Sequence, residues 1–252
     1  MRCLGRTFDK NPADYRLYRP GYPAGLPERV INTLGLGKGC RILEIGCGAG
    51  QATTLFTGLL PSQVCIEPGP GLLKQCRAAH GDLPGYSFVQ SSFEDLQCRP
   101  GSFDLIYAAT CFHWLVPGLR FQKAHRLLSR GGGLAVFTHR HVKGWEGFFT
   151  DVQSVYRREA PELVRPVSGV TLKEEGLEEN PLKLLHESEF DQENTYTGEE
   201  YTGLLRTFSD HISLGEERLG RLCSGVRDLI DEKYGGRVSR TLTTHLSIFV
   251  RV

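Results

Sequence analysis

The chain has 252 residues, of which 40% are hydrophobic and 23% charged, and its 30 basic and 29 acidic residues leave a formal net charge of +1. This composition excludes an intrinsically disordered chain, and the length is ample for a closed core with a ligand cleft. The near-neutral charge argues against a protein that follows nucleic-acid phosphates, so we expect no nucleic-acid partner.

No part of the sequence predicts a membrane segment. Residues 1–6 carry charge without an apolar run behind them, and the longest apolar stretch, residues 105–116, contains His113 and is too short for a bilayer. The eight cysteines form no Cys-x-x-Cys pair, and several lie in apolar runs, so we interpret them as reduced. We therefore expect a cytoplasmic protein with no membrane contact.

The first half of the chain alternates predicted helices with short apolar strands. A helix over residues 24–35 is predicted to stop at Gly35. Strands are expected at 41–45, 63–67, 86–89, 103–108 and 134–138, and helices at 51–60, 70–80 and 118–129, the last closed by the glycines at 131–133. This order predicts a parallel sheet covered by helices on both faces.

The alternation changes after residue 140. Residues 141–185 are charged and contain prolines, with one expected helix over 146–159, and we interpret them as an inserted helical cap. Two further strands, 186–197 and 242–252, are expected to pair as an antiparallel hairpin, with helices over 198–208 and 215–233 between them. The predicted fold is an α/β, doubly wound, mostly parallel sheet of seven strands. Its parts are an N-terminal arm and core (1–140), the cap (141–185) and a segment that completes the core (186–252).

Three alternating glycines follow the first predicted strand, in the sequence Glu44-Ile45-Gly46-Cys47-Gly48-Ala49-Gly50. Glycines at a strand-to-helix turn let the backbone turn sharply and approach a ligand, which then faces the N–H groups of the next helix. Glu67 lies 21 residues after Gly46, at the end of the second strand, where an acid accepts hydrogen bonds from ribose hydroxyls. Together these features predict an adenosine ligand.

The spacing of the glycines distinguishes between adenosine ligands. A dinucleotide fingerprint needs a third Gly or Ala where this sequence has Gln51 or Thr53, depending on the frame. A triphosphate loop needs Gly-Lys-Ser/Thr, but Gln51 and Ala52 follow Gly50. An acid two residues before Gly-x-Gly-x-Gly fits a positively charged ligand without a pyrophosphate. We therefore expect S-adenosylmethionine as the cofactor and S-adenosylhomocysteine as its product.

With these motifs the sequence resembles the class I S-adenosylmethionine-dependent methyltransferases over most of its length. Residues 44–50 match the first motif of that family and Glu67 its second-strand acid, while residues 88–96 and 101–104 resemble the segment that frames the adenine, with Ser92 where Asp is common. Residues 109–114 and 18–23 are similar to the subgroup that includes trans-aconitate methyltransferases. The resemblance implies a Rossmann-like fold and direct in-line methyl transfer to a small molecule without a metal.

The resemblance also implies a set of cofactor-binding residues. Its expected members are Glu44, Gly46, Cys47, Gly48, Gly50, Glu67, Pro68, Ser92, Phe93, Ala109, Thr110, Tyr18 and Arg19. For Glu44, contact with the ligand and support of the loop are equal alternatives. Arg19 or the tyrosines around it are expected to meet the methionyl carboxylate as part of a lid, the alternative being a packed arm fixed by Pro20 and Pro23.

His113 follows the fourth strand and is the candidate catalytic residue. It would act as a base on a phenol, alcohol or amine and only as an orienting contact for a carboxylate, and a structural histidine is the third alternative. His139 and His141 would share one face of an extended strand. Since no third ligand stands at a suitable spacing, we expect these two residues and Arg140 to form a polar, positive rim near the acceptor and no metal site.

The expected acceptor is a carboxylate, or an oxygen or nitrogen of a metabolite or natural-product precursor. An Asn-Pro-Pro-Tyr-like turn typical of nucleic-acid base methylation is replaced by residues 109–112, Ala-Thr-Cys-Phe. A short-chain oxidoreductase would need Tyr-x-x-x-Lys, and no tyrosine has a lysine four residues later. A non-catalytic sensor or partner subunit that binds S-adenosylmethionine would keep the same loop and is the alternative. We expect a monomer or homodimer.

Overall fold

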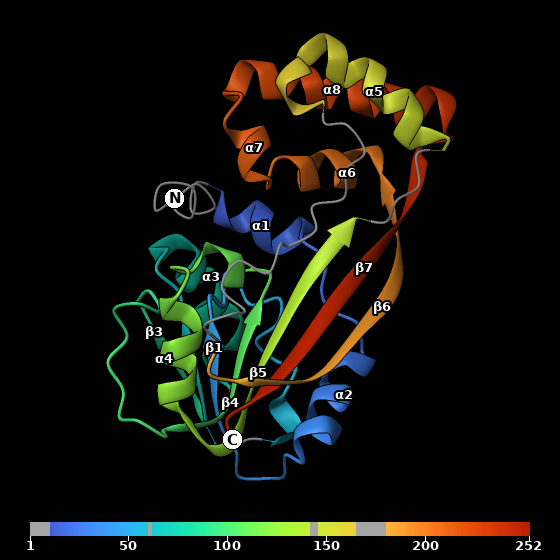
Figure 1. The fold of residues 1–252 in the computed structure, drawn as a ribbon. Coiled ribbons are helices and arrows are strands. Elements are labelled where there is room, and N and C mark those ends of the chain that lie inside the picture. The colour runs from blue at the N-terminus through green and yellow to red at the C-terminus, as the bar shows by residue number, and fades with distance from the viewer. Residues whose placement is uncertain (1–10, 60–61, 142–145, 165–179) are drawn as a thin grey trace.

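One seven-stranded sheet runs through the molecule, in the order β3-β2-β1-β4-β5-β7-β6 (Figure 1). The computed structural model describes residues 11–59, 62–141, 146–164 and 180–252. The strands are β1 (Arg41–Ile45), β2 (Ser62–Ile66), β3 (Tyr86–Val89), β4 (Phe103–Ala109), β5 (Leu128–His141), β6 (Lys183–Thr197) and β7 (Arg237–Val250). The first five are parallel, and β7 runs antiparallel to both β5 and β6. The predicted fold class is confirmed.

Helices cover both faces of this sheet because its central strands are apolar on both sides. In β1, Ile42 packs with α2 (Gly25–Leu34) and Leu43 faces the core that contains residues of α4 (Leu119–Leu127). Both side chains are fully buried, as expected for strands of a parallel sheet. A third helix that covers the sheet, α3 (Pro70–His80), packs its Leu73 and Cys76 against Cys65 near the end of β2.

The long strands β5, β6 and β7 lead to a group of helices that we call the helical lobe (Figure 1). It consists of α5 (Phe148–Glu159), α6 (Gly198–Leu205), α7 (Ser209–Ile212) and α8 (Glu216–Lys233), with η4 (Pro161–Leu163). These helices share an apolar core with the start of β7, where Val152, Leu222 and Val238 are buried. Helix α1 (Pro12–Tyr18) lies under the lobe and contacts both α6 and α3.

The prediction of a helix at 51–60 is wrong for residues 51–59, which form turns that end in the 3-10 helix η2 (Thr57–Leu59). Buried side chains bind carbonyl groups that a regular helix would use. The Tyr107 hydroxyl donates to the Ala52 carbonyl at 3.2 Å, and the Gln63 amide donates to the Thr53 carbonyl at 2.9 Å. No complete α-helix therefore presents its N-terminus directly behind the glycine loop.

The glycines at 131–133 lie inside β5, so the prediction that they close the preceding helix is also wrong. Helix α4 ends at Leu127, and β5 pairs with β4 on both sides of the glycines, with an irregular register between the two pairings. A Cβ at Gly133 would lie 2.4 Å from the Leu34 side chain of α2. Glycine is needed there so that the strand can pass under this helix.

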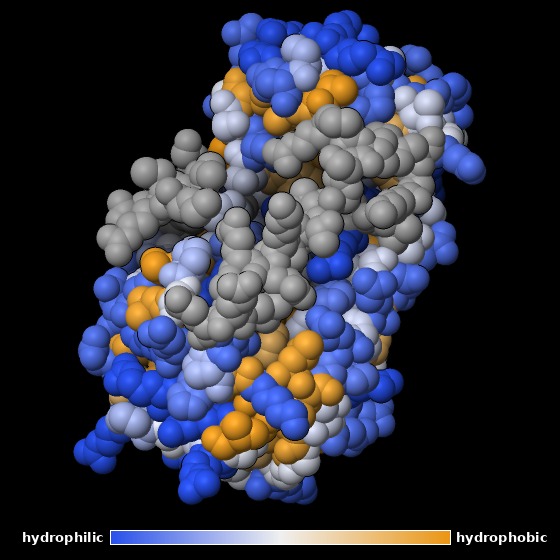
Figure 2. Space-filling model, in the orientation of Figure 1, coloured by the Kyte–Doolittle hydropathy of each residue, from blue (hydrophilic) through white to orange (hydrophobic). Residues whose placement is uncertain are grey.

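The other predicted elements are present, although β5, β6 and β7 are longer than expected because their ends pair with one another. No helix in the described ranges is long and apolar enough to cross a bilayer. Hydrophobic side chains gather near the C-terminus in the space-filling view (Figure 2), and Leu184, Leu185 and Val252 are exposed. The boundaries of the cap stay a prediction, because residues 142–145 and 165–179 lie outside the described ones.

Candidate functional site

The glycine loop follows β1 at the carboxyl edge of the sheet. Its three glycines all have positive φ angles, 64° at Gly46, 56° at Gly48 and 99° at Gly50. A Cβ would lie 2.9 Å from the Cys111 sulfur at Gly46 and 2.7 Å from the His80 ring at Gly50. Glycine is therefore required both for the backbone conformation and for close packing.

Glu67 connects the glycine loop to the start of α3. Its carboxylate accepts a hydrogen bond from the Gly48 N–H at 3.1 Å and another from the Gly69 N–H at 2.9 Å. The residue is only 6% exposed. The acid predicted at the end of the second strand therefore lies against the loop, outside the walls of the pocket described below, and its contact with a ribose stays a prediction.

Glu44 lies underneath the loop and is fully buried. Its carboxyl accepts hydrogen bonds from the Thr53 hydroxyl at 2.8 Å and from the Gln63 amide at 3.3 Å. Burial raises its pKa to about 7, although the hydrogen bond from Thr53 opposes this shift. Glu44 also borders the pocket above the loop, but its side chain is fully buried, so the structure shows it as a support of the loop.

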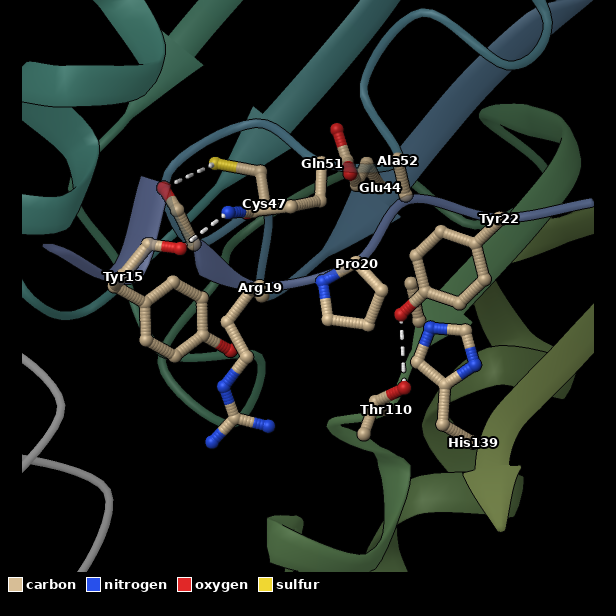
Figure 3. A pocket seen from close by; sticks show the side chains of 13 residues that line it. Tyr15, Arg19, Pro20, Tyr22, Glu44, Cys47, Gln51, Ala52, Thr110 and His139 are labelled. Carbon is tan, nitrogen blue, oxygen red and sulfur yellow. Dashed lines mark hydrogen bonds between the residues drawn. The ribbon is translucent and has the colours of Figure 1, made fainter. Parts of the chain in front are cut away.

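This pocket joins the glycine loop to the N-terminal arm and to the ends of β4 and β5 (Figure 3). It is lined by Tyr15, Arg19, Pro20, Tyr22, Glu44, Gly46, Cys47, Gly48, Gln51, Ala52, Ala109, Thr110 and His139. The cavity has a volume of about 40 Å³, which is room for only a few water molecules. The Arg16 guanidinium donates to the Ala49 carbonyl, and the Gln51 amide to the Tyr15 carbonyl, both at 2.9 Å. The arm is thus closed on the loop.

The wall opposite the loop is built from Tyr22, Thr110 and His139. The hydroxyls of Tyr22 and Thr110 are 2.8 Å apart, and the Tyr22 ring stacks on His139 with 4.4 Å between ring centroids (Figure 3). Thr110 is the only described residue other than glycine with a positive φ, 57°. A β-branched residue is strained in this conformation, and such strain concentrates at functional sites.

The expected positive rim at residues 139–141 is not formed as predicted. Burial lowers the pKa of His139 to about 4, so its imidazole is neutral at neutral pH, and its Nδ1 lies 3.0 Å from the Thr244 hydroxyl. Arg140 points to the other face of the sheet, 3.9 Å from Glu189, and the side chain of His141 lies outside the described ones. Within the described ranges no three His, Cys, Asp or Glu side chains could together hold a metal ion.

Arg19 lies between the pocket and the helical lobe. Its guanidinium stacks between the rings of Tyr15 and Phe208, at 5.0 and 4.4 Å from their centroids, and donates to the Thr207 carbonyl at 2.9 Å. Burial lowers its pKa, its Nε is buried without a hydrogen-bond partner, and no ion pair involves it in the described part of the chain. A shielded guanidinium in this state fits an anionic group of a ligand.

Several predicted site residues lie outside the pocket walls. Tyr18 packs its ring against Gly203 of α6, Ser92 hydrogen-bonds to Asp95 at 2.7 Å, and Phe93 is buried in the core. Pro68, which follows β2 in the chain, is exposed. Gly50 lines an open groove between α1 and α3. Their roles toward the cofactor stay predictions.

The candidate catalytic residue His113 does not line the pocket either. It lies in η3 (Phe112–Trp114), with its ring tilted against Trp114 at 4.8 Å between centroids. Burial lowers its pKa, so the imidazole is more readily neutral than an exposed one. Its catalytic role stays a prediction.

Sequence analysis did not assign Gln51 and Ala52 to the site, although both line the pocket. Their position directly after Gly50 is the only feature of the sequence that could have assigned them to the site. Gln51 reaches the pocket because its amide binds the Tyr15 carbonyl, 36 residues away in the chain, and this contact depends on how the arm packs.

Comparison with known proteins identifies a matching domain. Residues 43–136 match the methyltransferase domain family. An uncharacterized methyltransferase-like protein of Schizosaccharomyces pombe is 26% identical over 172 residues, which cover 63% of this chain and 62% of that protein. An uncharacterized methyltransferase of Mycobacterium tuberculosis is 30% identical over 146 residues, 57% of each chain. The chain thus spans less than two thirds of these relatives.

Solved structures share the fold at low sequence identity. A candidate type II methyltransferase from Anaeromyxobacter dehalogenans superposes with a TM-score of 0.62 at 19% identity, covering 92% of this chain and 97% of that one. A geranyl diphosphate methyltransferase in complex with SAM gives a TM-score of 0.51 at 12% identity, covering 91% and 85%. At this identity the likeness concerns the fold alone. None of these comparisons identifies the trans-aconitate-like subgroup.

Proposed function

We propose that this chain, which carries a class I methyltransferase domain, transfers a methyl group from S-adenosylmethionine to a small-molecule acceptor. The observation that carries the proposal is the glycine loop itself. All three glycines have positive φ, two of them (Gly46 and Gly48) line a pocket together with Arg19, and the Glu67 carboxylate holds the Gly48 N–H of the loop. This set of groups fits an adenosine with a charged amino-acid tail.

The groups of this chain match the parts of that cofactor. Glu67 is suited to the ribose hydroxyls and Arg19 to the carboxylate of the methionyl tail, whereas the assignment of Ser92 and Phe93 to the adenine side rests on the resemblance alone. When bound, the cofactor supplies a methyl group that is already activated by the sulfonium. The protein therefore has to hold the acceptor in line and exclude water, which the aromatic walls around Tyr15 and Tyr22 favour.

The arm is the part that has to open for binding. A cavity of about 40 Å³ cannot hold an adenosine cofactor, and α1 closes it through Arg16 and Tyr15. We infer that residues 11–24 act as a lid over the cofactor, and that the predicted cap at 141–185 completes the acceptor side. The near-neutral charge of the chain supports a small acceptor over a nucleic acid.

Calorimetry with S-adenosylmethionine and S-adenosylhomocysteine tests the cofactor, and transfer of a labelled methyl group tests the activity. A panel of phenols, alcohols, amines and carboxylates is incubated with the methyl-labelled cofactor, and products are detected by their gain in mass. We expect binding of both cofactor forms and methylation of at least one acceptor. Binding without transfer to any member of the panel would contradict the proposed activity and favour a sensor.

A further inference from the structure

The aromatic ring of Tyr15, in α1, lies against the glycine loop. A Cβ at Gly48 would be 3.6 Å from Cε1 of this ring, so the ring fills the space into which a side chain at this position would project. Both residues line the same pocket (Figure 3). The ring therefore covers the central glycine of the loop.

The same ring connects the two charged groups that the proposed cofactor would meet. The Gly48 N–H donates to the Glu67 carboxylate at 3.1 Å, and the Arg19 guanidinium stacks on the Tyr15 ring at 5.0 Å from its centroid. Burial raises the pKa of the Tyr15 hydroxyl, on which the charges of Arg19 and Glu67 act with opposite sign. A ligand that reaches from Glu67 to Arg19 has to pass over Gly48, where the ring lies.

The volume of the pocket shows that the ring and a cofactor exclude each other. The cavity beside Tyr15 has about 40 Å³, whereas sites for small molecules and cofactors typically have about 300–1,000 Å³. The pocket gains room over the glycine loop only when the Tyr15 ring moves away from Gly48.

Two hydrogen bonds hold α1 on the loop in this conformation. The Gln51 amide donates to the Tyr15 carbonyl, and the Arg16 guanidinium donates to the Ala49 carbonyl, both at 2.9 Å. Arg16 is exposed, so water can replace its contact with the loop. The closed position of Tyr15 thus depends on contacts that can open without disturbing the core.

The packing of α1 on its other sides indicates the direction of opening. Toward α3 the helix borders an open groove of about 490 Å³. Toward α6 it packs so closely that a Cβ at Gly203 would lie 2.5 Å from the Tyr18 ring, and Arg19 donates to the Thr207 carbonyl just beyond α6. The helix can therefore leave the loop while it stays attached to the helical lobe.

We propose that Tyr15 makes an autoinhibitory contact, in which its ring occupies the place of the cofactor in the free protein and S-adenosylmethionine enters only when α1 leaves the loop. This inference rests on the proposed function. As the ring leaves, Arg19 loses one of its two stacking partners, Tyr15, keeps Phe208, and turns to the carboxylate of the methionyl tail. The contact limits the rate of binding, because only the open fraction of molecules accepts the cofactor.

The test compares association of S-adenosylhomocysteine with the full-length wild type, Tyr15→Ala and Leu17→Ala by stopped-flow fluorescence. Tyr15→Ala should raise the association rate constant by about ten- to a hundredfold, which corresponds to an open fraction of about 1–10% in the wild type. Leu17 belongs to the same helix but is 71% exposed, so Leu17→Ala is the control and should associate like the wild type.

The opposite result has a different kinetic signature. If the ring only contacts the bound cofactor, Tyr15→Ala should associate at the rate of the wild type and dissociate faster. That outcome would overturn the autoinhibitory contact.

A measurement on the wild-type protein keeps the proposal testable if Tyr15→Ala folds poorly. Nuclear Overhauser effects between the Tyr15 ring hydrogens and the α-hydrogens of Gly48 should be present in the free protein and lost on saturation with S-adenosylhomocysteine. Their absence from the free protein, or their persistence in the complex, would overturn the proposal.

These outcomes separate the inference from the proposed function. Wild-type association kinetics in Tyr15→Ala would remove the role of Tyr15 and leave cofactor binding and methyl transfer intact. If neither the wild type nor Tyr15→Ala bound S-adenosylmethionine or S-adenosylhomocysteine, both proposals would fail.

Discussion

Among single residues, Glu67 has the most direct predicted effect on the cofactor. Glu67→Ala should weaken binding of S-adenosylmethionine by about ten- to a hundredfold, since charge-assisted hydrogen bonds contribute about 1.5–3 kcal/mol. It also leaves the N–H groups of Gly48 and Gly69 without this carboxylate, so the free energy of unfolding should fall by about 1–3 kcal/mol.

Calorimetry and urea unfolding of Glu67→Ala check both effects. Glu28→Ala, a change at an exposed glutamate of α2, is the control and should alter neither value. Unchanged cofactor affinity in folded Glu67→Ala would show that this acid does not meet the ribose.

Glu44 makes the stability of the protein depend on pH. Its pKa is raised from 4.5 to about 7 in the folded protein, so its contribution is most favourable below pH 4.5 and is lost as the pH rises through 7. The loss amounts to about 3 kcal/mol at pH 8. The glutamine side chain in Glu44→Gln cannot ionise, so this variant should not show the loss of stability between pH 5 and pH 8.

Urea unfolding of both proteins at pH 5 and pH 8 measures this effect. The comparison also removes the contribution of His139, which has the opposite sign because its lowered pKa makes stability fall as the pH falls from 6.5 toward 4. Equal pH dependence in wild type and Glu44→Gln would contradict a buried, ionising Glu44.

At the scale of elements, the contact between α1 and α6 depends on a glycine. A Cβ at Gly203 of α6 would lie 2.5 Å from the Tyr18 ring, whereas nothing lies within 4 Å of one at Gly220 of α8. Gly203→Ala should therefore lower stability by about 1–3 kcal/mol and weaken cofactor binding, because α1 carries Tyr15 and is followed directly by Arg19, and both line the pocket. Gly220→Ala, its control, should raise stability by about 0.5–1 kcal/mol. Urea unfolding measures both changes. An equal change in the free energy of unfolding of the two variants would contradict the packing of α1 on α6.

For the whole molecule, the cofactor class can be tested by comparing how much different ligands stabilise the folded state. At a concentration of one hundred times its Kd, S-adenosylmethionine should raise the free energy of unfolding by about 2.7 kcal/mol and the melting temperature by roughly 5–10 °C. NAD at the same concentration should leave the melting temperature unchanged, because the dinucleotide glycine is replaced by Gln51 or Thr53. A larger shift with NAD in differential scanning fluorimetry would contradict the cofactor assignment.

The order of strands and helices could be read from the sequence because it depends on patterns only a few residues long. Apolar runs in β1 and β4 reflect burial on both faces of a parallel sheet, and the three glycines reflect φ angles that other residues rarely adopt. The same local reasoning found the loop, the acid Glu67 and the closing antiparallel pair of strands.

Only the tertiary structure decided the features that depend on packing between distant segments. The turns at 51–59 replace a helix because Tyr107 and Gln63 bind their carbonyls, and Gly133 lies in β5 where that strand pairs with β4 and passes close to Leu34 of α2. Arg19 reaches a carbonyl 188 residues away, and Tyr156 reaches a histidine 55 residues away. No spacing in the sequence encodes such contacts, because each depends on the angle and depth at which two elements meet.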